Sequence, residues 1–506
     1  MEKHEERYMW VALAVVIVGT FMSVLDSSIV NVAVPKMMTV FGASTDKIQW
    51  VVTGYMLVMS IVIPLTGYLG DRFGLKKIYV IALITFTVGS TLCGFAGSTE
   101  TMIAARVLQG IGGGMIMPVG MAMIYMIVPL EKRGVALGVW GVAAMAAPAI
   151  GPPLSGYIVQ NLDWRLIFNI NIPIGIIGTT LAILLLKETK IVKDKKFDFL
   201  GALTSAVGLF TFLLALSEGN SKGWSSIYEI VLFFIASISL LSFVFIELAV
   251  EDPLLDLRVL KNTAFSLSLV ISAITTIGMY GALFLLPIYM QSIRGYSPMQ
   301  AGMLSLPMAI VTGIMMPISG SLFDKFGAKW LTTIGISVLA GASYLLSKLT
   351  LDTSYTSIIM IMMVRGLGMG MSMMPAQAAG MNSIPKNQSS KATALSNTVR
   401  QLSGSIGIAI LTTVFQHRQV FHTARLSESI NLTSPAVVAA QNTLSSLASK
   451  SGFLMQIYSQ LVKKAAVEGI NDALLVSTFI CLAGVPLAFF INRSNIKNKV
   501  QETNEL

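Results

Sequence analysis

Charged residues are scarce in this chain of 506 residues, since only 12% are Asp, Glu, Lys or Arg while 54% are hydrophobic. Soluble domains carry about 25% charged residues. The composition therefore excludes an ordinary soluble protein and predicts an all-α polytopic membrane protein. The net charge of +10 does not indicate nucleic acid as a partner, because Lys and Arg gather in the cytoplasmic loops of membrane proteins.

Cysteine and histidine are almost absent as well. Cys93 and Cys481 lie in apolar runs without CxxC or metal-ligand spacing, so we expect neither a disulfide framework nor a metal site. His4, His417 and His422 all fall outside the apolar runs. Because histidine is the usual side chain that titrates near neutral pH, a proton carrier inside the membrane would have to be a carboxylate.

A nucleotide-binding motif is also lacking. The run GIGGG at 110–114 lies inside an apolar segment with no strand before it, which predicts helix packing and not a phosphate loop. We therefore expect no cofactor, no catalytic residue and no enzymatic activity, and we do not expect ATP to be the energy source unless another subunit supplies it.

Fourteen apolar segments are long enough to cross a bilayer, which takes about 20 residues each. An even number places both termini on one side. Lys and Arg are concentrated in the short loops on the side of the termini, which predicts that both termini are cytoplasmic. The segments lie near 10–31, 48–68, 78–97, 101–127, 135–158, 166–186, 199–217, 229–248, 264–290, 300–322, 330–348, 356–378, 396–416 and 472–492.

Two pairs of similar sequences reveal an internal repeat. GYLGDRFGLKK at 67–77 follows the second segment, and SGSLFDKFGAKW at 319–330 follows the tenth. Likewise Arg106 opens the fourth segment, and Arg365 lies in the twelfth. The offset is eight segments, which predicts two six-helix bundles with two extra helices between them. Such repeats are typical of secondary transporters, whose substrate site lies between the halves near the middle of the membrane.

The repeat predicts the domain organisation. We expect a six-helix bundle over 1–190, two extra helices within 191–262, and helices nine to thirteen over 263–416. An extracytoplasmic loop at 417–471, either a helical hairpin or a flexible cap, precedes the last helix and a cytoplasmic tail at 472–506.

Several further motifs strengthen the interpretation. They are LDSSIVNVAVP at 25–35, Arg106 to Gly110, PAIGPPLSG at 148–156, WRLIFNINIPIG at 164–175 and SNTVRQLSGSIGIAI at 396–410. With the turn at 67–77 they make the chain resemble the major facilitator superfamily over essentially its whole length. It is most similar to the fourteen-span drug:proton antiporters of the EmrB/QacA type, the DHA2 family. Ser155 departs from the pattern, where glycine is usual.

The resemblance implies a multidrug efflux transporter of the bacterial inner membrane that confers antibiotic resistance. Such a protein exports amphipathic, often cationic compounds by alternating access, in exchange for protons. Membrane lipids surround it, and a periplasmic adaptor and an outer-membrane channel are expected partners if the host has two membranes. One alternative is a dedicated exporter of a single natural solute or lipid with the same mechanism. Another is a non-transporting membrane scaffold, which no attached interaction domain supports.

Asp26 is the main candidate for proton coupling, because ionisable side chains inside a membrane are costly and usually functional. It lies about 24 Å along a helix that starts at Trp10, which predicts a position in the outer half of the membrane. Protonated Asp26 would release a cationic substrate, and ionised Asp26 would attract one. The alternative is a structural role in which Asp26 is hydrogen-bonded to Ser27, Ser28 or Asn31.

The other candidates are also charged residues of the apolar segments. Arg106 either modulates the proton site or forms a structural bond to backbone carbonyls, and the roles of Arg365 and Arg400 are left open. Glu218 and Glu247 end the seventh and eighth segments near the interface, where charge is cheap, and are secondary candidates for a proton carrier.

Two motifs are expected to govern conformational change. In the turn at 67–77, Asp71 can accept from N–H groups at a helix N-terminus, so this turn can hold one global state; a merely polar loop is the alternative. The small and kinking residues of the fifth segment are expected to seal the pathway between the halves, unless they only allow tight packing. The motif residues are Gly67, Asp71, Arg72 and Gly74 with Asp324 in the second copy, and Pro148, Gly151, Pro152 and Gly156.

Overall fold

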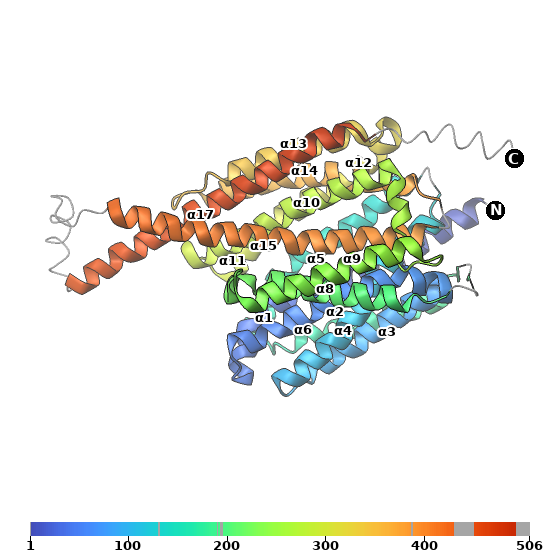
Figure 1. Ribbon diagram of the computed structural model, residues 1–506, viewed down its shortest axis with the longest axis horizontal. Helices are drawn as coiled ribbons and strands as arrows, with labels where there is room; N and C mark the ends of the chain where they lie inside the picture. The colour runs from blue at the N-terminus through green and yellow to red at the C-terminus, as the bar shows by residue number, and fades with distance from the viewer. Residues whose placement is uncertain are drawn as a thin grey trace.

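A computed structural model describes residues 2–129, 132–189, 191–192, 196–385, 388–429 and 450–491. Fourteen helices in these ranges are long and apolar enough to cross a membrane, which confirms the number expected from the sequence. The centre of the loop predicted at 417–471 and the tail after 491 lie outside the described residues. The chain is thus a bundle of long helices with short connections (Figure 1).

The first part of the chain supplies six spans, and the sixth is broken at Ile170. Pro173 in its second half has no N–H with which to bond the carbonyl oxygen of Asn169 one turn earlier, so a backbone hydrogen bond is missing where the span is broken. Figure 1 labels most of these elements. They are α1 (Glu2–Phe41), α2 (Thr45–Phe73), α3 (Leu75–Gly94), α4 (Thr99–Ile127), α5 (Arg133–Asn161), α6 (Leu166–Asn169) and α7 (Asn171–Leu185).

The rest of the chain supplies eight spans. Two of them depart from a single regular helix: α10 ends in a π-helical turn, and a short helix precedes α12. The elements are α8 (Phe199–Lys222), α9 (Ile227–Ala249), η2 (Leu257–Lys261), α10 (Thr263–Ile288), η3 (Tyr289–Ile293), α11 (Pro298–Met303), α12 (Ser305–Phe326), α13 (Ala328–Leu346), α14 (Tyr355–Asn382), α15 (Ser389–Ser429) and α17 (Lys450–Phe489).

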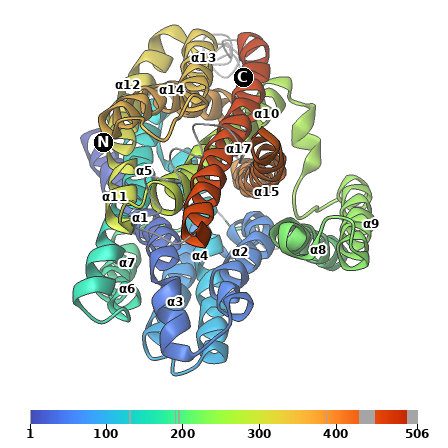
Figure 2. The same cartoon turned by 90° about the vertical axis from the view of Figure 1, so that its left-hand side faces the viewer.

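The helices α8 and α9 lie at the edge of the bundle (Figure 2). Helix α9 packs mainly on α8, and α8 packs on α2 and α15. Because α2 belongs to the first half and α15 to the second, this pair of helices sits beside a junction between the halves.

Helices α15 and α17 extend beyond the rest of the bundle as two adjacent helices (Figure 1). Arg418 on α15 contacts Asp472 on α17 at 2.5 Å. His422 lies between Asp472 at 2.8 Å and Glu468 at 3.0 Å. The described flanks of 417–471 are therefore helical, which favours the hairpin over the flexible cap. Residues 430–449 lie outside the described part of the chain.

Helices α5 and α12 bring the two halves together through glycine. A Cβ atom on Gly320 would lie 2.4 Å from the carbonyl oxygen of Gly134, and one on Gly138 would lie 2.7 Å from Pro317 Cα. Only glycine allows backbones to approach this closely. The α5–α12 contact therefore depends on the absence of side chains at these positions.

We predict that Gly320→Ala destabilises the protein by about 1–3 kcal/mol, because the added methyl group meets rigid backbone. The midpoint of thermal unfolding in detergent measures this effect. Gly341→Ala is the matched control, since a Cβ atom there meets nothing within 4 Å, and it should be neutral or slightly stabilising. Equal midpoints for both variants would show that the α5–α12 contact is looser than described.

Candidate functional site

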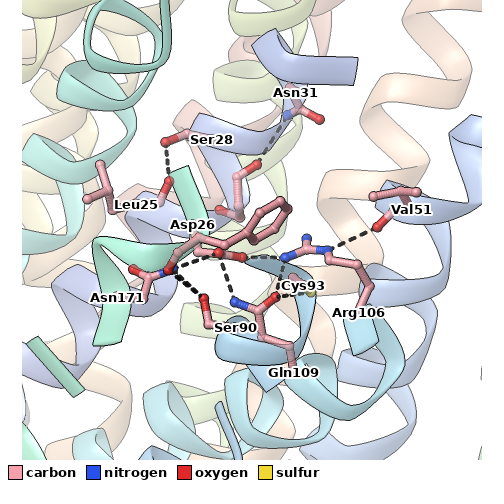
Figure 3. A network of polar contacts seen from close by, with 12 residues as sticks. Leu25, Asp26, Ser28, Asn31, Val51, Ser90, Cys93, Arg106, Gln109 and Asn171 are labelled. Atoms are coloured by element: carbon pink, nitrogen blue, oxygen red, sulfur yellow. Dashed lines mark hydrogen bonds and ion pairs between the residues drawn. The ribbon is translucent and has the colours of Figure 1, made fainter. Parts of the chain in front are cut away.

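Asp26 lies at the centre of a polar network that joins five spans (Figure 3). Its side chain is 0% exposed. Oδ2 accepts a hydrogen bond from Arg106 of α4 at 2.6 Å. Oδ1 accepts from Gln109 Nε2, also of α4, at 2.9 Å, and from Asn171 Nδ2 of α7 at 3.0 Å. Both carboxylate oxygens thus have donors, and Asp26 holds α1 against α4 and α7.

Arg106 is equally buried, with 1% of the residue exposed. Besides Asp26 it donates to the backbone oxygen of Val51 on α2 at 3.1 Å and to Gln109 Oε1 at 2.7 Å. Its guanidinium lies 3.9 Å from the ring centre of Tyr55, close enough for a cation–π contact. The pairing with a carboxylate and the bond to a backbone carbonyl, expected as alternatives, are both present.

Gln109 and Asn171 are network residues that the sequence analysis did not single out. Gln109 follows Arg106 by three positions, so both lie on one face of α4, and this spacing was the available signal. Asn171 begins α7 just after the break at Ile170. It also donates to Ser90 Oγ of α3 at 3.0 Å. The break in the sixth span therefore places a polar side chain in the core.

The residues around Asp26 in α1 do not cap it. Ser27 and Ser28 donate to the backbone oxygens of Val24 and Leu25. Asn31 is exposed and donates to Ser27 O at 3.2 Å. The alternative in which these three residues bond Asp26 was therefore wrong in its partners, and Asn31 is not part of the network.

The network can respond chemically to a proton. Three N–H donors surround the carboxyl group of Asp26. Adding a proton to Asp26 would remove the charge that balances Arg106. A buried charge that loses its partner is costly, by about 3–5 kcal/mol in studied cases. The Asp26–Arg106 contact is therefore a point at which α1 and α4 are held together by paired charges.

The second half has a buried arginine that corresponds to Arg106, but no carboxylate is paired with it among the described residues. Arg365 of α14 is fully buried and donates to Ser343 Oγ of α13 at 2.6 Å and to the carbonyl oxygen of Gly278 on α10. Within the described part of the chain no carboxylate pairs with it, and its Nε atom has no partner. The structure therefore places a charge pair of this kind only in the first half, among the residues described.

Arg400 and Glu218 lie away from the Asp26 network. Arg400 on α15 bonds Asn397 and lies 3.2 Å from Met117 Sδ of α4, so it faces the first half. Glu218, near the end of α8, neighbours Tyr228 and Glu229 of α9. The structure does not bring either of them to Asp26.

The turn between α2 and α3 is built around Gly74, whose φ of +91° favours glycine. The carboxylate that accepts from the first N–H groups of α3 belongs to Glu188, at 3.1 Å from both Lys76 N and Lys77 N. The sequence analysis assigned that position to Asp71, whose backbone oxygen accepts from Val192 N. Glu188 was missed because it lies over 110 residues away along the chain.

The structure gives different information on the other motif residues of this turn and of its second copy. Gly67 faces α15, since a Cβ atom there would lie 3.3 Å from Lys391 Cα. Arg72 lies in the last turn of α2. In the second copy Gly327 repeats the positive φ, at +79°, whereas the side chain of Asp324 lies outside the described residues.

The motif of α5 packs on the part of α1 that follows Asp26. A Cβ atom on Gly151 would lie 2.0 Å from Ser28 Oγ. Ser155, where glycine is usual in the family, is buried and donates to Ile29 O at 2.6 Å. At the same end a Cβ atom on Gly302 of α11 would lie 2.8 Å from Pro152 Cβ, whereas one on Gly156 would make only ordinary contact with Met299, at 3.8 Å. Helix α5 thus touches both the site and the second half.

Pro148 lies inside α5 with Pro152 and Pro153, and the helix nevertheless runs unbroken from Arg133 to Asn161. The neighbouring spans provide the context in which proline is tolerated in a membrane helix. The motif therefore acts within one helix and does not end it.

Comparisons with known proteins agree with this architecture. The family model of the Major Facilitator Superfamily matches residues 16–408. The uncharacterized MFS-type transporter YhcA of Bacillus subtilis is 40% identical, over 97% of this chain and 94% of that protein. Lincomycin resistance protein LmrB of Listeria monocytogenes is 33% identical, over 80% and 86% of the two chains. Multidrug export protein EmrB of Escherichia coli K12 is 30% identical, over 93% of both.

Solved structures share the fold at low sequence identity. The human organic anion transporter MFSD10 is 12% identical with a TM-score of 0.65, over 95% of this chain and 99% of that one. The proton:xylose symporter XylE is 15% identical with a TM-score of 0.60, over 95% and 97%. The chain is therefore a multi-pass membrane transporter of the major facilitator superfamily, and belongs to its fourteen-span EmrB/QacA type.

Proposed function

We propose that this protein exports amphipathic, often cationic small molecules from the cytoplasm in exchange for protons, with both termini on the cytoplasmic side. The single observation on which the proposal of proton coupling rests is the buried Asp26–Arg106 pair. Asp26 is the only acidic side chain in the interior of the spans α1–α7 that the structure describes. The relatives named for lincomycin resistance and multidrug export support the substrate class.

The network suggests how a proton changes the conformation. A proton on Asp26 weakens its bond to Arg106, while Arg106 keeps Gln109, Val51 and Tyr55 as neighbours. Helix α1 can then shift relative to α4. Because Ser28 and Ile29 of α1 pack on α5, this movement is passed on to α5.

Helix α5 connects this movement to the second half. Its glycines at 134 and 138 touch α12 directly. Beside them Arg133 donates to Asn382 Oδ1 of α14 at 3.1 Å. A shift of α5 therefore changes the contact between the halves, which is the movement that alternating access requires.

The burial of Asp26 determines how the substrate takes part. In this conformation Asp26 is enclosed and all its oxygens have donors, so a cationic substrate has no direct access to it. We propose that substrate and proton compete through the position of α1 and Arg106, and that direct attraction by Asp26 is confined to other conformations.

The available energy is sufficient for export. One elementary charge that moves through 100 mV supplies about 2.3 kcal/mol. A tenfold concentration ratio corresponds to about 1.4 kcal/mol. One proton per neutral substrate therefore supports a ratio of roughly 50 from the membrane potential alone. Exchange of one proton for one monovalent cation moves no net charge, so the pH gradient has to drive the export of such a cation.

We predict that Asp26→Asn abolishes proton-coupled transport, with at least a roughly tenfold fall in the rate of ethidium movement, since about 1.4 kcal/mol in a barrier is tenfold in rate. Reconstituted protein under an imposed pH gradient is assayed for dye and proton flux together. The control Asp163→Asn replaces an exposed loop carboxylate and should transport normally. Persistent coupled flux in the Asp26 variant would contradict the proposal. If the wild type moves no compound of a dye panel, broad drug export is wrong.

A double-variant cycle separates the structural from the functional role of the pair. Arg106→Gln alone leaves a buried carboxylate with fewer donors and should cost about 3–5 kcal/mol of stability. Combining it with Asp26→Asn removes both charges, so thermal stability should recover while coupled transport stays absent. Recovery of transport together with stability would mean that Asp26 has only a structural role.

A further inference from the structure

Two carboxyl groups outside the Asp26 network face each other at one end of the α8–α9 pair. Asp198 precedes α8, and its Oδ1 accepts from Gly201 N at 2.8 Å. Glu247 lies in the last turn of α9, and its Oε2 accepts from Leu255 N at 3.0 Å. Asp198 is 8% exposed and Glu247 is 0% exposed. The sequence analysis placed Glu247 where charge is cheap, but the protein encloses its side chain.

The second oxygen of each group has no hydrogen-bond donor among the described residues. These atoms are Asp198 Oδ2 and Glu247 Oε1. Both face one point, because a Cβ atom on Gly201 would lie 2.2 Å from the first and 2.9 Å from the second. Glycine at this position leaves room for the two oxygens to approach.

Two ionised carboxylates cannot stay in this arrangement at low cost, because like charges repel and burial removes their solvation. One proton resolves the problem, since the protonated oxygen then donates to the other. We propose that Asp198 and Glu247 form a carboxyl pair that holds one exchangeable proton, at a protonation site separate from Asp26.

The charged groups around the pair connect it to the halves of the transporter. Asp256, just before η2, is paired with Lys391 of α15 at 3.3 Å, and both are mostly buried. Arg258 donates to the backbone oxygens of Leu248 and Val250 at the end of α9. Among the described residues, neither cation has a hydrogen bond to the pair.

Lys391 is the link to the movement between the halves. Its backbone lies against Gly67 of α2, in the turn motif. Release of the proton leaves a negative charge on the carboxyl pair, near Asp256 and Lys391. This charge competes with Asp256 for Lys391, whose backbone packs on α2. The role of the pair in transport rests on the proposed proton coupling, whereas the existence of the shared proton does not.

Infrared difference spectroscopy of the full-length protein in nanodiscs tests the proposal directly. At neutral pH exposed carboxyl groups are ionised, so a protonated carboxyl C=O band reports buried groups. We expect one such band to disappear in both Glu247→Gln and Asp198→Asn, and to persist in Asp26→Asn. Glu251→Gln, at an exposed position four residues from Glu247, should leave it unchanged. Gly201→Ala should remove or shift the band without changing any charge.

The infrared results decide whether Asp198 and Glu247 share a proton. A band that survives in both Glu247→Gln and Asp198→Asn overturns the proposal. A band that appears only after sodium and magnesium are removed also overturns it, in favour of a cation site. In transport, Glu247→Gln should shift the pH dependence of export and keep coupling, unlike Asp26→Asn. A wild type without proton-coupled transport would refute the proposed function, while the infrared result would still stand on its own.

Discussion

The ion pair between Asp26 and Arg106 is the interaction on which the rest of this structure depends. It lies in a network that joins five spans and is completed by Gln109 and Asn171. A buried pair of this kind adds little net stability compared with apolar packing, but it is costly to break from one side. That asymmetry makes the pair suitable as the proposed switch, because a single proton on Asp26 removes one charge of the pair and so changes the contact between α1 and α4.

The two halves of the protein are similar in architecture but not in chemistry. Arg365 repeats Arg106, yet a hydroxyl and a backbone carbonyl take the place of the carboxylate among the described residues. In the proposed mechanism the response to a proton on Asp26 therefore begins in the first half and reaches the second half through α5 and α12. Close contacts at Gly134, Gly138 and Gly320 make that interface sensitive to small shifts. Cores that are packed this tightly respond by discrete rearrangement and not by gradual deformation.

The sequence predicted the number of spans and the family well, because hydropathy and the repeated turn are local patterns. It also identified Asp26 and Arg106, since charges inside apolar segments are conspicuous. It did not identify Asn171, whose role arises from a helix break beside Pro173, or Glu188, which meets α3 only through tertiary folding. Ser27, Ser28 and Asn31 were named as partners of Asp26 from their nearness along the chain, whereas a helix directs them to their own backbone. Short-range proximity was misleading at the points where the contacts are long-range.

The most direct test of this account measures the distance between spin labels on the ends of α5 and α12, near Lys132 and Lys325, as a function of pH. The wild type should show two distances whose populations change with pH, because protonation of Asp26 releases Arg106 and shifts α1 and α5. Asp26→Asn, which mimics the protonated side chain, should keep the low-pH distance at every pH. If the variant shows the same pH-dependent change as the wild type, the Asp26–Arg106 pair does not control the contact between the halves.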